Sequence, residues 1–165
     1  MPIKKLLARG AILATGLSIK KLLEFGFDMV LYPAALALLG YVTGGAVMMA
    51  AAIILNALII KAYDWSKTDW LYIEEIKKVR DNDDVKLPGI LNILKPLLRK
   101  GDIFAFFILC FDDPVTVVLY LRKGSHLYNG MSSRDWKIFF AANVVANLYW
   151  ITGLIAIIET FKLFL

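Results

Sequence analysis

Long apolar runs divide the chain, and its charged residues collect between them. Met29 to Ile60 contains 32 residues without a charge. A single helix of that length would measure about 48 Å, well beyond the roughly 30 Å hydrocarbon core of a bilayer. The run therefore folds back on itself, and we expect membrane spans at 22–42 and 45–63.

Glycines mark the turn between these two spans. Gly40, Gly44 and Gly45 supply the turn residues. Gly40 and Gly44 also form Gly-x-x-x-Gly, a pattern that lets helices pack closely. Because it coincides with the predicted turn, the pattern favours turn formation over packing. For packing, the second span offers small residues on roughly one face: Ala46, Ala50 and Ala57.

Basic residues flank the hairpin on both sides. Residues 1–21 combine apolar residues at helical spacing with lysines and an arginine, which is typical of an interfacial amphipathic helix. Glu24 and Asp28 are expected at the membrane interface, close to the lysines that precede them. Residues 64–102 form a polar connection, with a helix predicted at 67–80, a polar break at 81–84 and a second basic amphipathic helix at 86–100.

The third apolar run, 103–121, is long enough to cross a membrane but carries Asp112-Asp113-Pro114 in its middle. An Asp followed by Pro suits the start of a helix, so the pair also predicts a point where one half-helix stops and another begins. We therefore expect a crossing helix at 103–121, with a broken, re-entrant segment as the alternative.

The fourth run is predicted to span at 135–158. Ser132-Ser133-Arg134-Asp135 forms a capping box at its start. The same pattern, Ser-x-x-Asp-Trp, occurs at 66–70 and at 132–136. We interpret both copies as a helix start with an interfacial Trp rather than as a duplicated unit.

These patterns predict an all-α integral membrane protein with four hydrophobic segments, the third one crossing or broken, together with basic amphipathic interfacial helices. Composition agrees: 59% of residues are hydrophobic and the mean hydropathy is +0.66. Ordinary globular chains are roughly 45–50% apolar. The 165 residues are expected to form one membrane domain, 1–165.

The net charge of +5 follows from 19 Lys and Arg, which avoid the apolar runs. Basic loops that orient a membrane protein explain this better than nucleic-acid binding, so no nucleic-acid partner is expected. The protein is predicted to be a multi-pass protein of the cell membrane, with its N-terminus and 61–102 in the cytoplasm. The expected partners are anionic lipid headgroups and membrane proteins, including further copies of itself.

Polar residues inside apolar runs are the candidates for function. Asp112 and Asp113 are the strongest, because carboxylates at membrane depth are costly and commonly mark ion or substrate pathways. Asn143 and Asn147 share a helix face, and an inward turn toward the two aspartates, together with Asn56, is one interpretation of them. Ordinary hydrogen bonding between helices is the plainer interpretation of the asparagines.

Two further basic residues, Arg122 and Lys123, are candidates for binding phosphate or lipid headgroups. A single histidine, His126, excludes a bis-histidine haem, and a single cysteine, Cys110, excludes an internal disulfide. No catalytic motif is present, no catalytic residue is assigned and no cofactor is expected. The sequence leaves open whether the protein binds a metal.

Three functions compete, and the sequence favours the first. The first is a non-enzymatic subunit of a homo-oligomer or of a larger membrane complex. The second is a small channel or transporter with Asp112 and Asp113 on an ion or solute pathway. The third is an enzyme acting on lipid phosphates at the cytoplasmic face. That enzyme would need the aspartate pair to hold Mg²⁺ beside Arg122 and Lys123, and thus a re-entrant third segment.

Overall fold

The computed structural model of the chain describes residues 3–78, 96, 98, 100–122 and 127–162. All regular structure in these residues is helical, so the predicted all-α class is confirmed. The predicted polar break at 81–84 and residues 86–95 of the second amphipathic helix lie outside the described residues.

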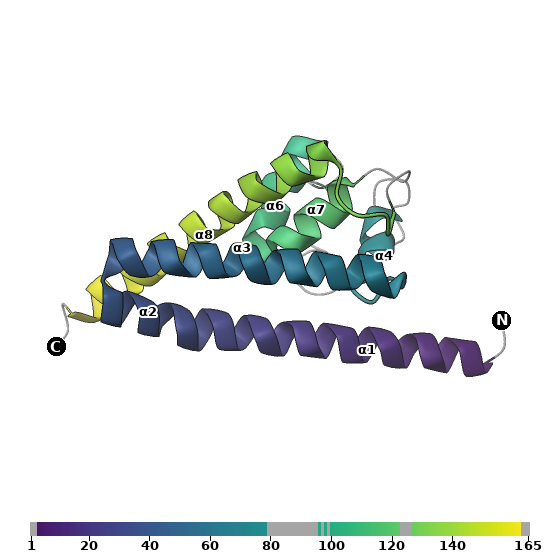
Figure 1. Ribbon diagram of the computed structural model, residues 1–165, viewed down its shortest axis with the longest axis horizontal. Helices are drawn as coiled ribbons and strands as arrows, with labels where there is room; N and C mark the ends of the chain where they lie inside the picture. Colours follow the sequence, from purple (N-terminus) through teal and green to yellow (C-terminus); the bar gives the residue numbers. More distant parts are fainter. Residues whose placement is uncertain (1–2, 79–95, 97, 99, 123–126, 163–165) are drawn as a thin grey trace.

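One long helical rod opens the chain (Figure 1). It comprises α1 (Ile3–Gly26), the π-helical turn η1 (Phe27–Leu31) and α2 (Tyr32–Leu39). The π turn ends two residues before Pro33, which has no N–H and whose ring crowds the preceding helical turn, so a widened turn accommodates it. The expected boundary between an interfacial segment, 1–21, and a separate span from residue 22 is absent, because no helix break occurs there.

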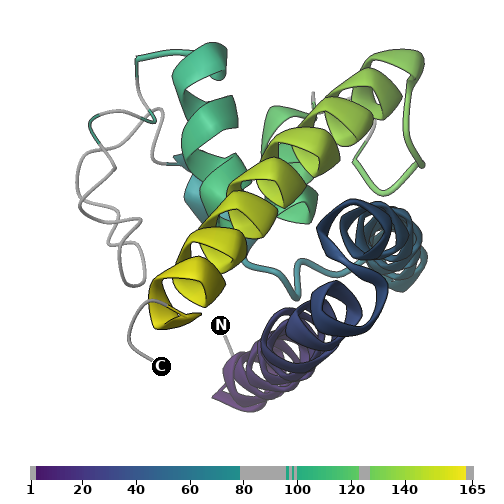
Figure 2. The ribbon, with the colours of Figure 1, turned by 90° about the vertical axis from the view of Figure 1, so that its left-hand side faces the viewer.

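The rod turns back at Gly40 into α3 (Tyr41–Ser66), which runs beside it (Figures 1 and 2). Gly40 has a φ of 79°, a conformation that favours glycine. Gly44 does more than the turn role predicted for it. A Cβ there would lie 2.5 Å from the carbonyl oxygen of Ala35, so Gly44 allows close helix packing.

The packing face predicted for the second span is wrong in part. Ala46 and Ala50 are exposed, and only Ala57 packs against the core. The residues of α3 that are buried instead are Gly44, Gly45, Met48, Ala52, Ile59, Ile60 and Tyr63.

The helix predicted at 67–80 is shorter and starts later than expected, as α4 (Ile73–Lys77). Ser66 does not cap it, because α3 extends through this serine, whose hydroxyl donates to the carbonyl of Tyr63 at 2.8 Å. Asp69 stabilises the start of α4. Its carboxylate accepts from the backbone N–H groups of Ile73 and Glu74 at 2.8 and 3.0 Å.

The third apolar run is not one crossing helix. It forms α6 (Asp102–Asp112) and α7 (Pro114–Leu121), separated by Asp113 in an extended conformation. The outer ends of the two helices lie together, because the Arg134 guanidinium reaches both. It donates to the carbonyl oxygen of Leu121 at 2.9 Å and lies 3.5 Å from the Asp102 carboxylate. The run is therefore a helical hairpin with Asp113 at its tip.

The last helix, α8 (Ser133–Lys162), begins with the predicted capping box. Asp135 accepts from the backbone N–H of Ser132 at 2.9 Å, and the Ser132 hydroxyl accepts from the backbone N–H of Asp135 at 3.2 Å. The far end of α8 reaches the turn between α2 and α3, where Glu159 accepts a hydrogen bond from the Tyr41 hydroxyl.

Three helices of the described chain are long and apolar enough to cross a membrane: Thr15–Leu39, Tyr41–Ser66 and Ser133–Lys162. The short hairpin of α6 and α7 packs against α8 and α3 and contributes residues to both apolar clusters of the core. Every residue of α7 after Pro114 is buried. Two apolar clusters surround this helix, one shared with α6 and α8 and the other with α3 and the segment around α4.

Candidate functional site

The tip of the α6–α7 hairpin is a buried carboxylate. Asp113 caps α7, as its position before Pro114 predicts, and accepts from the backbone N–H of Thr116 at 2.8 Å and from its hydroxyl at 2.9 Å. The ammonium group of Lys20 lies 3.3 Å from the same carboxylate, and both side chains are 7% exposed. The first helix and the hairpin are thus joined by a buried ion pair.

Lys20 belongs to a charged face of the first helix. Lys20, Glu24 and Asp28 follow one another at intervals of four residues and so lie on one side of the helix. Glu24 accepts a hydrogen bond from Lys20 and lies 3.2 Å from the ammonium group of Lys21. Glu24 and Asp28 were expected at the membrane interface. In the structure the helix face that carries them is turned toward the hairpin tip, a contact that this expectation did not include.

Two other carboxylates at this place make no direct contact with a cation of the described residues. Within the described part of the chain, neither Asp28 nor Asp112 takes part in a hydrogen bond or ion pair. Asp112 is exposed and Asp28 is half-buried. The two lysines already contact Glu24 and Asp113, so the charges of Asp28 and Asp112 are not neutralised by direct contact.

The asparagines join α3, α8 and α2 through hydrogen bonds, as the plainer interpretation of these residues has it. The Asn56 amide on α3 donates to the side-chain oxygen of Asn143 on α8 at 2.8 Å. One turn along α8, Asn147 accepts a hydrogen bond from the Tyr32 hydroxyl on α2. Asn143 is fully buried and Asn147 is 5% exposed. Of the three, Asn56 and Asn147 reach the cavity described next.

A cavity of about 470 Å³ lies between the first helix, α3, the hairpin tip and α8. This volume is within the range of small-molecule sites, roughly 300–1,000 Å³. Its polar wall brings together residues from all four elements: Lys21, Glu24, Asp28, Tyr32, Asn56, Asp112, Asp113 and Asn147. It thus includes the predicted Asp112 and Asp113 and adds the acidic face of the first helix.

The rest of the wall is apolar and rich in aromatic rings. Phe27 and Trp150 contribute from the π turn and from α8. The Trp150 indole nitrogen is buried and has no hydrogen-bond partner among the described residues. Leu23, Phe25 and Phe111 also line the cavity while being 47%, 63% and 76% exposed, so they form its rim.

The cavity lies about midway along the three long helices. At about 1.5 Å per residue, Asn56 is roughly 15 Å from the end of α3 at Ser66. Asn147 is roughly 21 Å from the start of α8 at Ser133. The charged groups around the hairpin tip are therefore far from both ends of the molecule.

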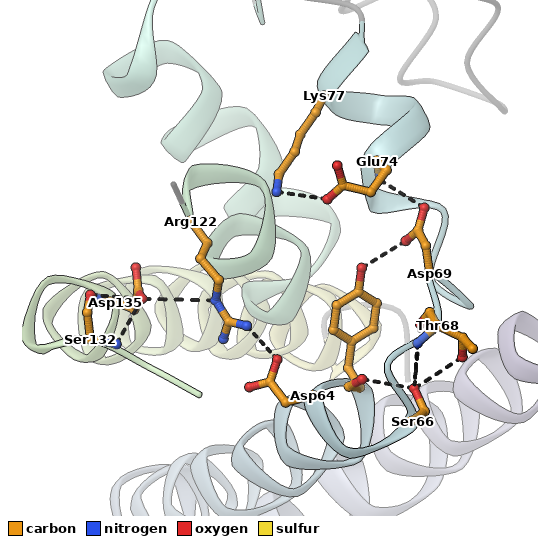
Figure 3. Close-up of polar contacts among 10 residues, drawn as sticks. Asp64, Ser66, Thr68, Asp69, Glu74, Lys77, Arg122, Ser132 and Asp135 are labelled. Atoms are coloured by element: carbon orange, nitrogen blue, oxygen red, sulfur yellow. Dashed lines mark hydrogen bonds and ion pairs between the residues drawn. The ribbon is translucent and has the colours of Figure 1, made fainter. Parts of the chain in front are cut away.

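Arg122 lies at the opposite end of α7 and makes a separate cluster (Figure 3). Its guanidinium donates to the Asp64 carboxylate at 2.5 Å and lies 4.0 Å from that of Asp135. The Arg122 side chain is 1% exposed. Since the eight residues of α7 separate Arg122 from Asp113, the structure does not bring it to the aspartate pair. Lys123 lies outside the described residues.

The sequence interpretation missed Lys20, Glu24, Asp28, Tyr32 and Trp150 as members of the site. A signal was present for three of them: Lys20, Glu24 and Asp28 are spaced by four residues at the start of an apolar run, which places them on one helix face. For Tyr32 and Trp150 there was none, because each looks like an ordinary aromatic residue of an apolar segment.

Known protein families, characterised proteins and solved structures show no match to this chain. In the described residues, no group of three His, Cys, Asp or Glu side chains is arranged to hold a metal ion. The fold and the cavity define an all-helical protein with three long apolar helices, two of which pack against a short helical hairpin.

Proposed function

We propose that this chain is an integral membrane protein and that its central cavity lies on a pathway for a cationic solute. The observation that carries the proposal is the cavity midway along the apolar helices, with unpaired carboxylates beside the tip of a broken helix. Ionisable groups at membrane depth are costly and typically mark ion or substrate pathways. Broken helices at that depth are a recurrent way to build such sites.

The topology that supports this proposal has three crossing helices and a re-entrant hairpin. The end of α3, both outer ends of the hairpin and the start of α8 lie together, joined by Arg122 and Arg134. Apart from Lys20 and Lys21 at the cavity, every Lys and Arg except Lys162 then belongs to the start of the first helix or to the segments 61–102 and 122–137, which this arrangement places on one side. By the positive-inside tendency that side is the cytoplasm, whereas a crossing third segment would place Arg122 and Arg134 outside.

A labelling experiment tests this topology. In a chain with Cys110 replaced by alanine, Asn129→Cys and Lys162→Cys are each treated with an impermeant thiol reagent on intact cells. Both Asn129 and Lys162 are exposed, so access depends on the side of the membrane. We expect Lys162→Cys to react and Asn129→Cys to react only after permeabilisation. Reaction of Asn129→Cys in intact cells would contradict the re-entrant hairpin.

A flux measurement tests the pathway. Purified protein is reconstituted into liposomes. The uptake of Na⁺, K⁺ and the organic cation ethidium is recorded under a membrane potential that is negative inside. We expect uptake of a cation above that of empty liposomes, and its loss in Asp112→Asn. Asp102→Asn, a change at the exposed start of α6, is the control. If no cation enters, or if both variants match the parent, the pathway is rejected.

The subunit interpretation stays a second candidate, favoured by one observation. Ala46 and Ala50 are exposed on α3, one turn apart, so a face of small residues is left outside the protein. Such faces allow close contact between membrane helices. Replacing Ala50 by leucine should then shift an oligomer to monomers in native mass spectrometry from mild detergent. A monomeric parent protein would remove this candidate.

A further inference from the structure

We propose that the cavity binds a lipophilic organic cation that enters sideways from the bilayer, with Asp28 and Asp112 as its counter-ions. This inference rests on the proposed function, because it names the class of solute that the cavity takes. It is argued from the charge of the cavity, from its walls and from the place of its rim.

The charge balance at the cavity calls for a cation. Four carboxylates line it: Glu24, Asp28, Asp112 and Asp113. Lys20 and Lys21 supply two ammonium groups, and their ion pairs are made with Glu24 and Asp113. Asp28 and Asp112 have no hydrogen bond or ion pair with described residues, although both face the cavity. A ligand with a positive charge would supply the missing partner, whereas an anion would face four carboxylates.

The walls favour an organic cation over a bare metal ion. The cavity of about 470 Å³ is much larger than an inorganic ion requires. Within the described residues, no cluster of three side chains is arranged to coordinate a metal. Phe27, Phe111 and Trp150 offer aromatic surface, which attracts organic cations through both apolar contact and the ring quadrupole.

The rim indicates the route of entry. Leu23, Phe25 and Phe111 line the cavity and are exposed at the same time. In the proposed topology they lie midway through the membrane, where exposed side chains contact acyl chains. The cavity therefore opens toward lipid, and a solute that partitions into the bilayer reaches it without first passing through either aqueous end of the protein.

The ammonium group of Lys20 is the counter-ion of Asp113 at the hairpin tip. It is buried and lies 3.3 Å from the Asp113 carboxylate. Asp113 is further occupied by the N–H and hydroxyl of Thr116. Asp113 is therefore a structural anion that is already neutralised, and the two carboxylates without partners are left for the ligand.

Equilibrium binding of tetraphenylphosphonium is the test. Radiolabelled probe is titrated onto the purified full chain in nanodiscs of zwitterionic lipid, and binding to empty nanodiscs is subtracted. We expect saturable binding to one site. The double variant Asp28→Asn with Asp112→Asn should bind about tenfold more weakly or worse, because each change removes a counter-ion of the probe. The charge-conserving pair Asp28→Glu with Asp112→Glu should retain binding.

The matched control is Glu159→Gln. This carboxylate lies at the far end of α8, is exposed and does not line the cavity, so the affinity should stay at the parental value. Size-exclusion profiles and thermal unfolding in detergent establish that each variant is folded. If the double variant aggregates, Asp112→Asn alone decides, since Asp112 is exposed and its replacement removes no hydrogen bond or ion pair with a described residue.

Several results would overturn the inference. The first is the absence of saturable binding by the parent protein. The second is parental affinity in a folded variant in which aspartate is replaced by asparagine. The third is displacement of the probe by Na⁺ or K⁺ at the same molar concentration as the probe. The assay requires no translocation, so its failure is distinct from that of the proposed pathway. Binding without flux rejects the pathway alone, and cation flux without tetraphenylphosphonium binding rejects this inference alone.

Discussion

The two ends of α7 each carry a buried ion pair, but they differ in what surrounds it. At the end of the helix, Arg122 contacts Asp64 and faces Asp135, so one cation serves two carboxylates from the neighbouring helices. At its start, Asp113 meets Lys20 in a region where carboxylates outnumber cations and a cavity adjoins. At the Arg122 end, the carboxylates of Asp64 and Asp135 lie beside a cation of the protein. At the Asp113 end, Asp28 and Asp112 have no ion pair with a described residue.

Under the proposed function, this difference separates an ion pair that only holds helices together from one that also adjoins the proposed binding site. Burying an ion pair gives little net stability, but removing one partner is strongly destabilising because a buried charge is left behind. Both pairs are therefore expected to hold helices together. Only the pair at the start of α7 lies beside unpaired carboxylates, and hence only changes there are expected to alter ligand binding as well as stability.

The largest effect on stability is expected for Arg122→Met. It would leave Asp64 and Asp135 without their cation, so we expect a loss of about 3–5 kcal/mol in the free energy of unfolding. Thermal unfolding in detergent measures it. Arg134→Met, which removes a half-exposed guanidinium from the same end, should cost about 1 kcal/mol or less. Equal losses in the two variants would contradict the buried role of Arg122.

A smaller loss, about 2–3 kcal/mol, is expected for Lys20→Met. Asp113 would lose its cation but would keep two hydrogen bonds from Thr116. The same change should tighten tetraphenylphosphonium binding, because Asp113 and Glu24 would lose a competing ammonium group. Unfolding and nanodisc titrations measure the two effects. Arg122→Met should leave the affinity of the folded protein unchanged, and a parallel change in both variants would erase the distinction between the two ends.

The smallest effect is expected for Thr116→Val. The change keeps the shape of the side chain and the backbone N–H cap but removes the hydroxyl that donates to Asp113 at 2.9 Å. A hydrogen bond to a charged group contributes about 1.5–3 kcal/mol, and Asp113 keeps its ion pair and the backbone N–H, so the midpoint of thermal unfolding should fall modestly. Thr116→Ser, which retains the hydroxyl, serves as the control. It should keep the hydrogen bond and lose only the methyl group.

The two copies of Ser-x-x-Asp-Trp show how far local pattern reaches. At 132–136 the copy forms the predicted capping box, because the chain enters α8 from a loop and the Ser132 N–H is available to Asp135. At 66–70 it does not. Ser66 is still part of α3, and Asp69 instead caps α4 across an intervening turn. The pattern is the same, but Ser66 is the last residue of α3 and its hydroxyl is bonded to the carbonyl of Tyr63, so it does not cap a following helix.

The site was predicted in part for the same reason. Asp113 as a helix cap, and the meeting of Asn56 with Asn143, followed from signals within a few residues and from inward-facing helix faces. The pairing of Lys20 with Asp113 joins residues that are 93 positions apart. No spacing rule reaches that far. Nor does the local sequence reveal that Arg122 contacts Asp64 rather than a phosphate, because both are anions that suit a guanidinium.

The sequence by itself determined the apolar helices, the turn at Gly40 and the break between Asp112 and Pro114. These depend on length, hydropathy and backbone preferences that act over one or two helical turns. Tertiary structure decided that the third run folds back as a hairpin and that the acidic face of the first helix meets its tip. Those outcomes depend on which buried charged groups pair across the bundle. An arrangement that left Lys20 or Asp113 buried without a partner would carry a large desolvation cost.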